Sequence, residues 1–390
     1  MKTMLITIGN IILVILMLIL YTSLWHYIGK KGSKILFYGK QSSKIYWIVF
    51  CFFAFSFILA AIARSTISIN NRFTGILTTI GAVSIALFFY LIILFPLTDL
   101  MKFILNKLGF NGSLRNYLSM AYGRGISIFI VVIIIFCFGF WHANHQSVTN
   151  YKLSINKKAG NIKTLNVVMV ADVHMGIMVR ENGLNKMVNS INKLKPDIVF
   201  FCGDMVDEST PTSLEVYFSK EFKNIKSKYG VYSITGNHEY AGNVSETIDY
   251  MKKAGVKVLQ DEAVKVNDSF YVVGRNDAAS GKKVKLLSEI LKNVDKSFPI
   301  IELNHRPVAL DEAEKNGVDL QLSGHTHEGQ IFPFNLVTKA VFKDDYGYLK
   351  EGNFNLIVTS GYGTWGPPIR IGTKGEIVDI KLQFQKQSRE

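Results

Sequence analysis

Five short blocks in the C-terminal two-thirds of the chain combine Asp, His and Asn residues at spacings that suit metal ligands. The candidate residues are Asp172 and His174 in Ala-Asp-Val-His, Asp204 and Asp207 in Gly-Asp-Met-Val-Asp, Asn237 and His238 in Gly-Asn-His-Glu, His305 in Asn-His-Arg-Pro, and His325 and His327 in Gly-His-Thr-His. Imidazole nitrogens, carboxylates and an amide oxygen, with no thiolate among them, suit borderline or harder divalent ions such as Mn, Fe or Zn. Two such ions about 3.5–4 Å apart can share a carboxylate and a hydroxide, and can stabilise an in-line displacement at phosphorus. The blocks therefore predict binuclear hydrolytic chemistry.

The positions of the histidines favour a functional site over scattered structural roles. The chain contains eight His, of which His26, His142 and His145 flank apolar segments in the N-terminal third. The other five all fall within the blocks. Structural histidines would be spread over surfaces and hydrogen-bonded core positions. One isolated Asp-x-His pair would carry little weight, but the ordered set of blocks indicates a shared site.

Short apolar runs precede the blocks and predict the strands that must position them. The predicted strands are Leu165–Ala171, Ile198–Cys202, Val231–Ile234, Phe270–Val273, Ile300–Leu303, Leu320–Leu322 and Leu356–Thr359. The predicted helices are Asn182–Leu194, Val244–Lys253, Val284–Lys292 and Val308–Lys315. This alternation is typical of α/β folds, in which sites form beyond the carboxyl ends of the strands. Gly203, Gly236 and Gly324 precede ligand residues, where an unusual backbone conformation is expected.

The N-terminal third has the composition of a membrane domain. Its candidates for spanning helices are Met4–Trp25, Ile45–Ala63, Phe73–Phe95 and Ile126–Trp141. A span needs roughly 20 apolar residues, with a lower limit of about 17. Residues 1–144 contain 12 Lys and Arg but a single acidic residue, Asp99, and so carry +11 of the net charge of +14. Positive charge between apolar segments is typical of membrane proteins and not of a nucleic-acid-binding groove.

The basic residues of the short loops predict the orientation of these helices. The loops after the first and third stretches hold nine Lys and Arg residues, against six on the opposite side. The positive-inside rule places the nine in the cytoplasm and residues 150–390 outside it. The first stretch is expected to be retained, because Leu24-Trp25-His26 is a poor cleavage site. Residues Leu97–Phe110 form either a helix on the membrane surface or an extension of the third span.

The order of the five blocks resembles that of the calcineurin-like metallophosphoesterases over roughly residues 165–383. The resemblance implies an α/β fold in which a sandwich of two sheets is flanked by helices. It implies one metal ion held by Asp172, His174, Asp204 and His327, and a second held by Asp204, Asn237, His305 and His325 with Asp204 bridging. It also implies that His238 lies near the leaving group, as a general acid or an electrostatic stabiliser, and that Asp207 orients its imidazole.

Three further features refine the resemblance. The stretch from Ser360 to Arg370 is similar to the bacterial, membrane-attached branch of the superfamily; read alone, it is a Gly/Pro-rich loop that either borders a pocket or forms a structural turn. Protein Ser/Thr phosphatases of the superfamily have a phosphate-binding Arg where this chain has Glu208, which argues against a phosphoprotein substrate. The membrane-attached branch usually has Gly where this chain has Glu328, a carboxylate that either repels an anionic substrate or faces solvent.

Together these patterns predict a multi-pass membrane protein, with four transmembrane helices in residues 1–149 and a metallophosphoesterase domain in residues 150–390. The expected activity is hydrolysis of a phosphoester, such as a lipid headgroup or an envelope polymer, at the extracytoplasmic surface of the cell membrane by a hydroxide that bridges two metal ions. One alternative is a cytoplasmic-facing nucleotide phosphodiesterase with the same chemistry. Another is a membrane sensor that binds phosphoesters without turnover, which the intact ligand set disfavours. Nucleic-acid binding is not expected, because the residues beyond 144 carry a net charge of only +3.

Overall fold

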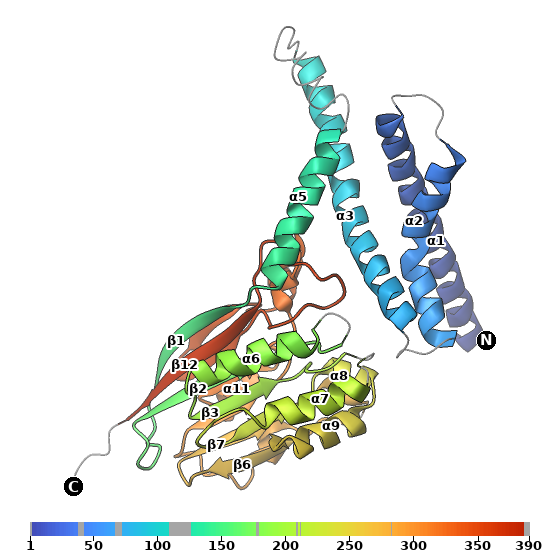
Figure 1. Ribbon diagram of the computed structural model, residues 1–390. Coiled ribbons are helices and arrows are strands. Elements are labelled where there is room, and N and C mark those ends of the chain that lie inside the picture. Colours follow the sequence, from blue (N-terminus) through green and yellow to red (C-terminus); the bar gives the residue numbers. More distant parts are fainter. Residues whose placement is uncertain are drawn as a thin grey trace. The chain divides into compact units, whose positions relative to one another are not determined.

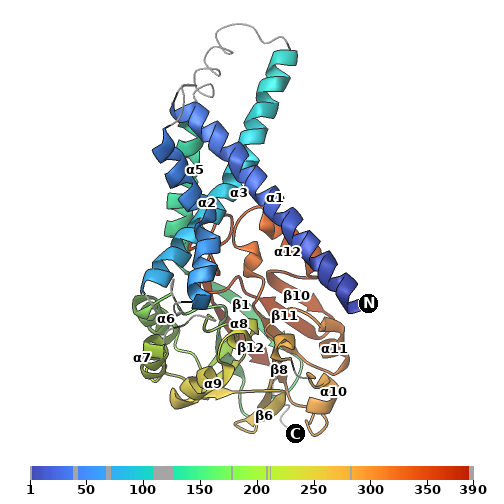
Figure 2. The ribbon, with the colours of Figure 1, turned by 90° about the vertical axis from the view of Figure 1, so that its right-hand side faces the viewer.

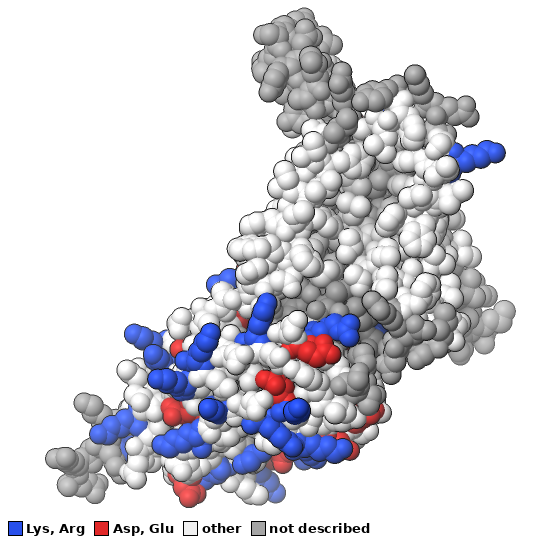
Figure 3. Space-filling model, viewed as in Figure 1, with Lys and Arg blue, Asp and Glu red and all other residues white. Residues whose placement is uncertain are grey.

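The computed structural model describes residues 2–37, 43–66, 72–108, 126–176, 179–207, 210, 212–281 and 283–385. The chain divides into two compact units, Met1–Phe138 and Gly139–Glu390. Figure 1 shows the N-terminal unit as long helices and the C-terminal unit as strands flanked by shorter helices. Charged side chains of both signs cover the visible face of the C-terminal unit, whereas the described part of the N-terminal unit shows very few (Figure 3).

The N-terminal unit consists of long apolar helices, namely α1 (Lys2–Leu36), α2 (Lys44–Thr66), α3 (Arg72–Lys107) and most of α5 (Ile126–Ala143). Among the described residues, three segments are long and apolar enough to cross a membrane: Ile12–Leu36, Lys44–Arg64 and Phe73–Lys107. The apolar part of α5, Ser127–Ala143, is shorter. Membrane-length helices are thus confirmed at three of the predicted positions, while the fourth span stays a prediction.

Residues Leu97–Phe110 are predicted from the sequence to form either a helix on the membrane surface or an extension of the third span. Their described part continues helix α3. Helix α3 runs to Lys107 and contains Pro96 in its interior, while residues 109 and 110 lie outside the described residues. Helices α2 and α3 approach closely at Gly81, where a Cβ atom would lie 2.7 Å from the Cα atom of Phe57. Only glycine permits two helix backbones to come this near.

Twelve strands form the framework of the C-terminal unit. They are β1 (Ser147–Ile155), β2 (Thr164–Val170), β3 (Ile198–Cys202), β4 (Val231–Ile234), β5 (Val256–Val258), β6 (Glu262–Val266), β7 (Phe270–Gly274), β8 (Ile300–Leu303), β9 (Leu320–Ser323), β10 (Gly347–Glu351), β11 (Phe354–Val358) and β12 (Glu376–Phe384). They form two six-stranded sheets, in the orders β1-β12-β2-β3-β4-β5 and β10-β11-β9-β8-β7-β6. Strands β2 to β5 run parallel, as do β7, β8, β9 and β11. The predicted α/β fold with two mixed sheets is confirmed.

Helices pack against the outer faces of these sheets. The helices of the unit are α6 (Glu181–Lys193), α7 (Thr212–Phe222), α8 (Asn237–Ala241), α9 (Val244–Lys253), α10 (Leu287–Ile290), α11 (Leu310–Lys315) and α12 (Phe334–Val341). Val167 and Met169 of β2 join the core between the sheets, whereas Val168 and Val170 pack with residues of α6, α7 and α9. Figure 1 shows these three helices on the same face of the sheet that contains β2. Because both faces of such strands are buried, their sequences are continuous apolar runs.

The last turn of α5 belongs to the C-terminal unit. The backbone N–H of Arg370 donates a hydrogen bond of 3.0 Å to the carbonyl oxygen of Gly139. Strand β1 then begins at Ser147 and pairs with β12 along its whole length. The sequence places the domain boundary between residues 149 and 150, inside β1, whereas the two units meet at Phe138. The difference arises because β-pairing with a strand from the end of the chain ties these residues to the sheet.

Candidate metal centre

The predicted ligands lie in loops that follow neighbouring parallel strands. The strands are β2, β3 and β4 in the first sheet, and β8 and β9 in the second. Side chains that follow the carboxyl ends of parallel strands can converge on one site. The structure brings the imidazole and carboxylate ligands into three overlapping groups, with the donor atoms of each group within 4.8 Å of one another: Asp172, His174 and His327; His174, Asp204 and His238; and Asp204, His305 and His325.

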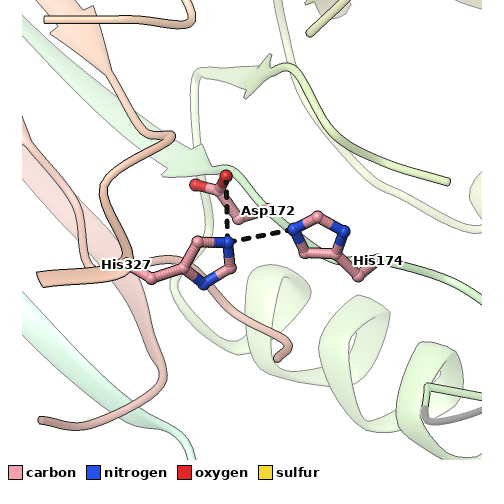
Figure 4. Close-up of side chains that lie close together, drawn as sticks. All are labelled: Asp172, His174 and His327. Atoms are coloured by element: carbon pink, nitrogen blue, oxygen red, sulfur yellow. Dashed lines mark hydrogen bonds and ion pairs between the residues drawn. The ribbon is translucent and has the colours of Figure 1, made fainter. Parts of the chain in front are cut away.

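Asp172, His174 and His327 form a buried group (Figure 4). The Nε2 atoms of His174 and His327 are 3.0 Å apart, and the Asp172 Oδ1 atom lies 3.5 Å from the His327 Nε2 atom. Two imidazole nitrogens that face each other can share at most one hydrogen bond, whereas a cation between them accepts a lone pair from each. This group therefore suits a metal ion.

Asp204, His305 and His325 form a second group. The Asp204 Oδ2 atom lies 3.0 Å from the His305 Nε2 atom, and the His325 Nδ1 atom lies 3.3 Å from the same nitrogen. The other ring nitrogen of His305, Nδ1, is 2.8 Å from the backbone oxygen of Cys202. A backbone acceptor of this kind fixes the tautomer and orientation of a ligand imidazole, and leaves Nε2 to bind the ion.

Asp204 connects two of the groups, and Asn237 offers a further buried oxygen. The Asp204 Oδ1 atom accepts a hydrogen bond of 2.8 Å from the backbone N–H of His238, while its other oxygen faces His305. The side-chain oxygen of Asn237 is buried and has no hydrogen-bond partner among the described residues. Leaving a buried amide oxygen without a donor is costly, and a bound cation removes that cost. The predicted amide ligand thus has a buried acceptor available.

The carboxylates of the centre favour the binding of cations. Burial alone would lower the pKa of His305, but the Asp204 and Asp172 carboxylates and the Cys202 carbonyl together outweigh burial and raise this pKa to about 10. Burial opposes ionisation of Asp204, yet its histidine neighbours hold its pKa well below the usual range. Burial lowers the pKa of His325 to about 3, so its imidazole is neutral, the form that binds metals. A site that stabilises protons between its carboxylates and imidazoles also stabilises a divalent cation.

The Asp207 carboxylate contacts two histidines. Its Oδ1 atom lies 2.8 Å from the Nδ1 atom of His174 and 3.7 Å from the Nδ1 atom of His238. The two imidazole rings are nearly perpendicular, with centroids 4.7 Å apart. The resemblance assigns Asp207 to His238, but the closer partner is His174. Asp207 therefore also directs the Nε2 atom of an expected metal ligand toward the first group.

The two predicted departures from the family pattern have different outcomes. Glu208 lies outside the described residues. Glu328 is half-buried, and burial together with the nearby Asp345 and Glu376 raises its pKa to about 7. Its carboxyl group therefore does not simply face solvent.

Several site residues have a left-handed backbone conformation, with φ angles of 53° at Asp172, 47° at His174, 52° at Asp204, 73° at His325 and 51° at His327. Such conformations cost on the order of 1–3 kcal/mol each and persist where the surrounding structure enforces them, often at functional sites. Gly203 has a φ of 87°, as expected for a glycine at an unusual backbone position. Gly236 differs: a Cβ atom there would lie 2.2 Å from the Asp204 Oδ1 atom, so close approach requires this glycine.

Glu239 supports the structure of the centre. It is the last residue of the Gly-Asn-His-Glu block, but we assign it no role from the sequence. Its side chain is fully buried. Its carboxylate accepts hydrogen bonds from the backbone N–H groups of Asp204, Met205, Val206 and Gly236, at 3.1, 2.6, 3.2 and 2.6 Å. The signal in the sequence is its position as the third residue of α8, where a Glu caps the helix start. Glu239 therefore holds the loop that carries Asp204.

We expect Glu239→Gln to lower metal affinity by about 10- to 100-fold, the usual effect of losing a partner that orients a ligand. In the variant, the amide NH₂ group of the new side chain would replace one carboxylate oxygen. It would then face backbone N–H groups, which cannot accept a hydrogen bond. Competition with a chromophoric chelator measures the affinity. The matched control is Glu289→Gln, which alters the exposed capping Glu of α10 outside the centre. Equal affinities for both variants would show that Glu239 does not support the ligand loop.

The Gly/Pro-rich closing stretch borders the centre through two side chains. Arg370 is fully buried, and its Nη2 atom donates hydrogen bonds of 2.7 Å to the carbonyl oxygens of Ser360 and Gly363. The same nitrogen lies 3.5 Å from His327. The exposed ring of Trp365 lies 6.1 Å from the ring of His238. The position of Arg370 depends on how the loop folds back on itself, which the sequence does not reveal.

Known proteins resemble this chain in its C-terminal unit and beyond it. Residues 165–329 match the family described as calcineurin-like phosphoesterase. A Campylobacter jejuni protein named uncharacterized metallophosphoesterase is 29% identical over 366 residues, 92% of this chain and 95% of that protein. One from Aquifex aeolicus is 33% identical over 246 residues, 60% of this chain and 91% of that protein. A Danio rerio protein named transmembrane protein with metallophosphoesterase domain is 25% identical over 281 residues, 68% of this chain and 64% of that protein.

Proposed function

Because the chain belongs to the calcineurin-like phosphoesterase family, we propose that it is a membrane-anchored, metal-dependent hydrolase of phosphoesters. The observation that carries the proposal is the convergence of seven Asp and His side chains, from loops of both sheets, in overlapping groups of suitable ligands. A protein that only bound phosphoesters would have no need of a complete set of this kind.

The donor set fits two divalent ions of the Mn, Fe or Zn type, as does the amide oxygen of Asn237, which has no partner in the described part of the chain. The ligands of the first would be Asp172, His174, Asp204 and His327, and those of the second Asp204, Asn237, His305 and His325. When bound, such ions lower the pKa of an attacking water and offset the negative charge that develops on the phosphoryl oxygens.

His238 has the position of a proton donor to the leaving group. Its side chain is 13% exposed and lies against His174, Asp207 and Trp365. Its backbone N–H donates to the Asp204 Oδ1 atom, which holds the ring beside the ligands. Protonation of the leaving oxygen by this imidazole is the step that we assign to it, with the Asp207 carboxylate favouring the charged ring.

Turnover by the purified full chain tests the proposal. The substrates should include phosphomonoesters, phosphodiesters and phospholipids, each tested with Mn, Fe or Zn added back. We expect hydrolysis of at least one class, and its identity separates monoesterase from diesterase. A folded, metal-loaded chain that binds these compounds but hydrolyses none would favour the sensor alternative.

The apolar helices and the transmembrane relatives indicate that the chain is associated with a membrane. We assign it a multi-pass arrangement with the catalytic unit on the extracytoplasmic side. The support is the excess of Lys and Arg in the loops after the first and third apolar stretches, nine against six.

Labelling of single cysteines tests this orientation. Asn156 is exposed in the loop after β1, and Lys34 is exposed near the end of α1 on the predicted cytoplasmic side. In a chain without the exposed Cys51 and Cys137, we expect a membrane-impermeant reagent to label Asn156→Cys in intact cells. It should label Lys34→Cys only after lysis. The reverse pattern would move the catalytic unit to the cytoplasm and favour the nucleotide phosphodiesterase alternative.

A further inference from the structure

Exposed apolar side chains cluster in the C-terminal unit around helix α12. None of the residues of α12 is buried, although most of them are apolar. We define the apolar rim as Leu336, Val337, Val341 and Trp365, which are 58, 54, 67 and 57% exposed. Large apolar side chains exposed together mark an interaction surface, whereas single ones are normal.

The rim adjoins the metal centre. Helix α12 follows the short turn His327–Gly329, and the ring of Phe342, just after the helix, lies 6.1 Å from the ring of His325. Trp365 lies beside His238. The Gln330 side chain holds Trp365, with Oε1 accepting from its backbone N–H (2.8 Å) and Nε2 donating to its carbonyl oxygen (2.9 Å). The rim therefore borders the centre at two places, beside His238 through Trp365 and near His325 through the end of α12.

The rim is also connected to the apolar end of α5. The backbone of Arg370 bonds to Gly139 in the last turn of α5, and the next residue, Ile371, donates to the carbonyl oxygen of Gln330 (3.0 Å). Phe332 then donates to the carbonyl oxygen of Ile371 (2.8 Å), just before α12. Figure 2 shows α12 beside the strands β10 and β11 of the same unit. A short path of backbone hydrogen bonds thus joins the rim to the apolar helix.

We propose that the apolar rim rests on the lipid surface of the membrane that anchors the chain, so that the metal centre acts on phosphoesters with hydrocarbon tails presented by that surface. The proposal rests on the proposed phosphoesterase function and names its substrate class. Trp side chains favour the membrane interface. The exposed Lys339 of α12 adds a positive charge that suits anionic headgroups. Amphipathic helices bind at interfaces through this combination.

Quenching by brominated lipids tests the contact independently of activity. The full chain, without Cys51 and Cys137, carries a fluorophore at Val337→Cys or, as a control, at Val216→Cys. Val337 and Val216 are similarly exposed, at 54 and 55%, and Val216 lies on α7 away from the rim. In vesicles whose acyl chains are brominated, we expect strong loss of fluorescence at residue 337 and none at residue 216. Equal signals, or quenching between labelled chains in place of lipid quenching, would overturn the proposal, the latter in favour of contact between copies.

Rates on two substrates test the consequence for catalysis. We compare nitrophenyl phosphate, which has no hydrocarbon tail, with phospholipid in vesicles, and take the ratio of the two rates. Leu336→Ser with Val341→Ser should lower the ratio of vesicle to soluble turnover about tenfold, since buried apolar area drives interfacial binding. The control pair, Val216→Ser with Leu286→Ser, alters two residues that are each 55% exposed and should leave the ratio unchanged.

The two claims fail in different ways. An unchanged ratio in the rim variant, with active protein, overturns the rim proposal and leaves the phosphoesterase function standing. If the metal-loaded wild-type chain hydrolyses neither of these substrates nor any member of the wider panel of phosphoesters, the function is overturned. Lipid quenching at residue 337 then still decides whether the rim contacts the bilayer.

Discussion

Asp204→Asn is expected to lower hydrolysis on the order of 10³-fold or more and to reduce the number of bound metal ions. Asp204 belongs to two of the three ligand groups, with one oxygen near His305 and the other fixed by the backbone of His238. Replacing one carboxylate oxygen by an amide nitrogen removes the negative charge that serves both groups. Other single ligand variants should cost less, because in the proposed ligand sets each of the other residues holds only one ion.

The matched control for this variant is Asp197→Asn. Asp197 lies just before the opposite end of the same strand, β3, and accepts a hydrogen bond from the backbone of Asn166 (2.8 Å). This change should leave metal content and turnover near the wild-type values. Elemental analysis and turnover of both proteins check the expectation. An Asp204→Asn protein with wild-type metal content and rate would exclude a bridging role.

His238→Ala is expected to keep the metal ions and to lose rate by about 10²–10⁴-fold on substrates with poor leaving groups. The loss should shrink for nitrophenyl esters, because nitrophenolate leaves with little protonation. The structure makes this a sharp test, since His238 is also grouped with His174 and Asp204 within 4.8 Å. Metal content together with rates on both kinds of ester measures the effect.

Asp207→Asn serves as the comparison. Because Asp207 is closer to His174 than to His238, this variant should lose metal affinity as well as rate. If His238→Ala itself loses a metal ion, or loses equal rate on good and poor leaving groups, His238 is a ligand or a charge stabiliser and not a proton donor.

The strands that carry the site could be predicted because burial on both faces makes them apolar throughout. The predicted bounds of β3, β4 and β8 agree with the structure. Strands β1 and β12 are absent from the predicted strands, which are continuous apolar runs. In β1 polar residues alternate with apolar ones, the pattern of a half-buried strand, and a buried Glu376 begins β12. That carboxylate accepts hydrogen bonds from Thr359 (2.8 Å) and from the backbone of Ser360 (3.1 Å), partners that only the folded loop supplies.

The candidate ligands could be recognised because each follows a strand directly, so local sequence already places it at the edge of a sheet. The contacts through which other side chains support these ligands could not be predicted. Glu239 reaches back to a loop more than 30 residues earlier, and Arg370 reaches His327 across 43 residues. Which loops cross in space depends on the packing of the two sheets, and a single sequence carries no local signal for it.

The most direct measurement of the central claim is phosphoester hydrolysis by the purified full chain after removal of metal ions by a chelator, followed by their stepwise return. We expect the folded, metal-free protein to be inactive, and activity to recover and saturate at about two divalent ions per chain. Full hydrolysis by folded protein in excess chelator would contradict metal-dependent catalysis at this site.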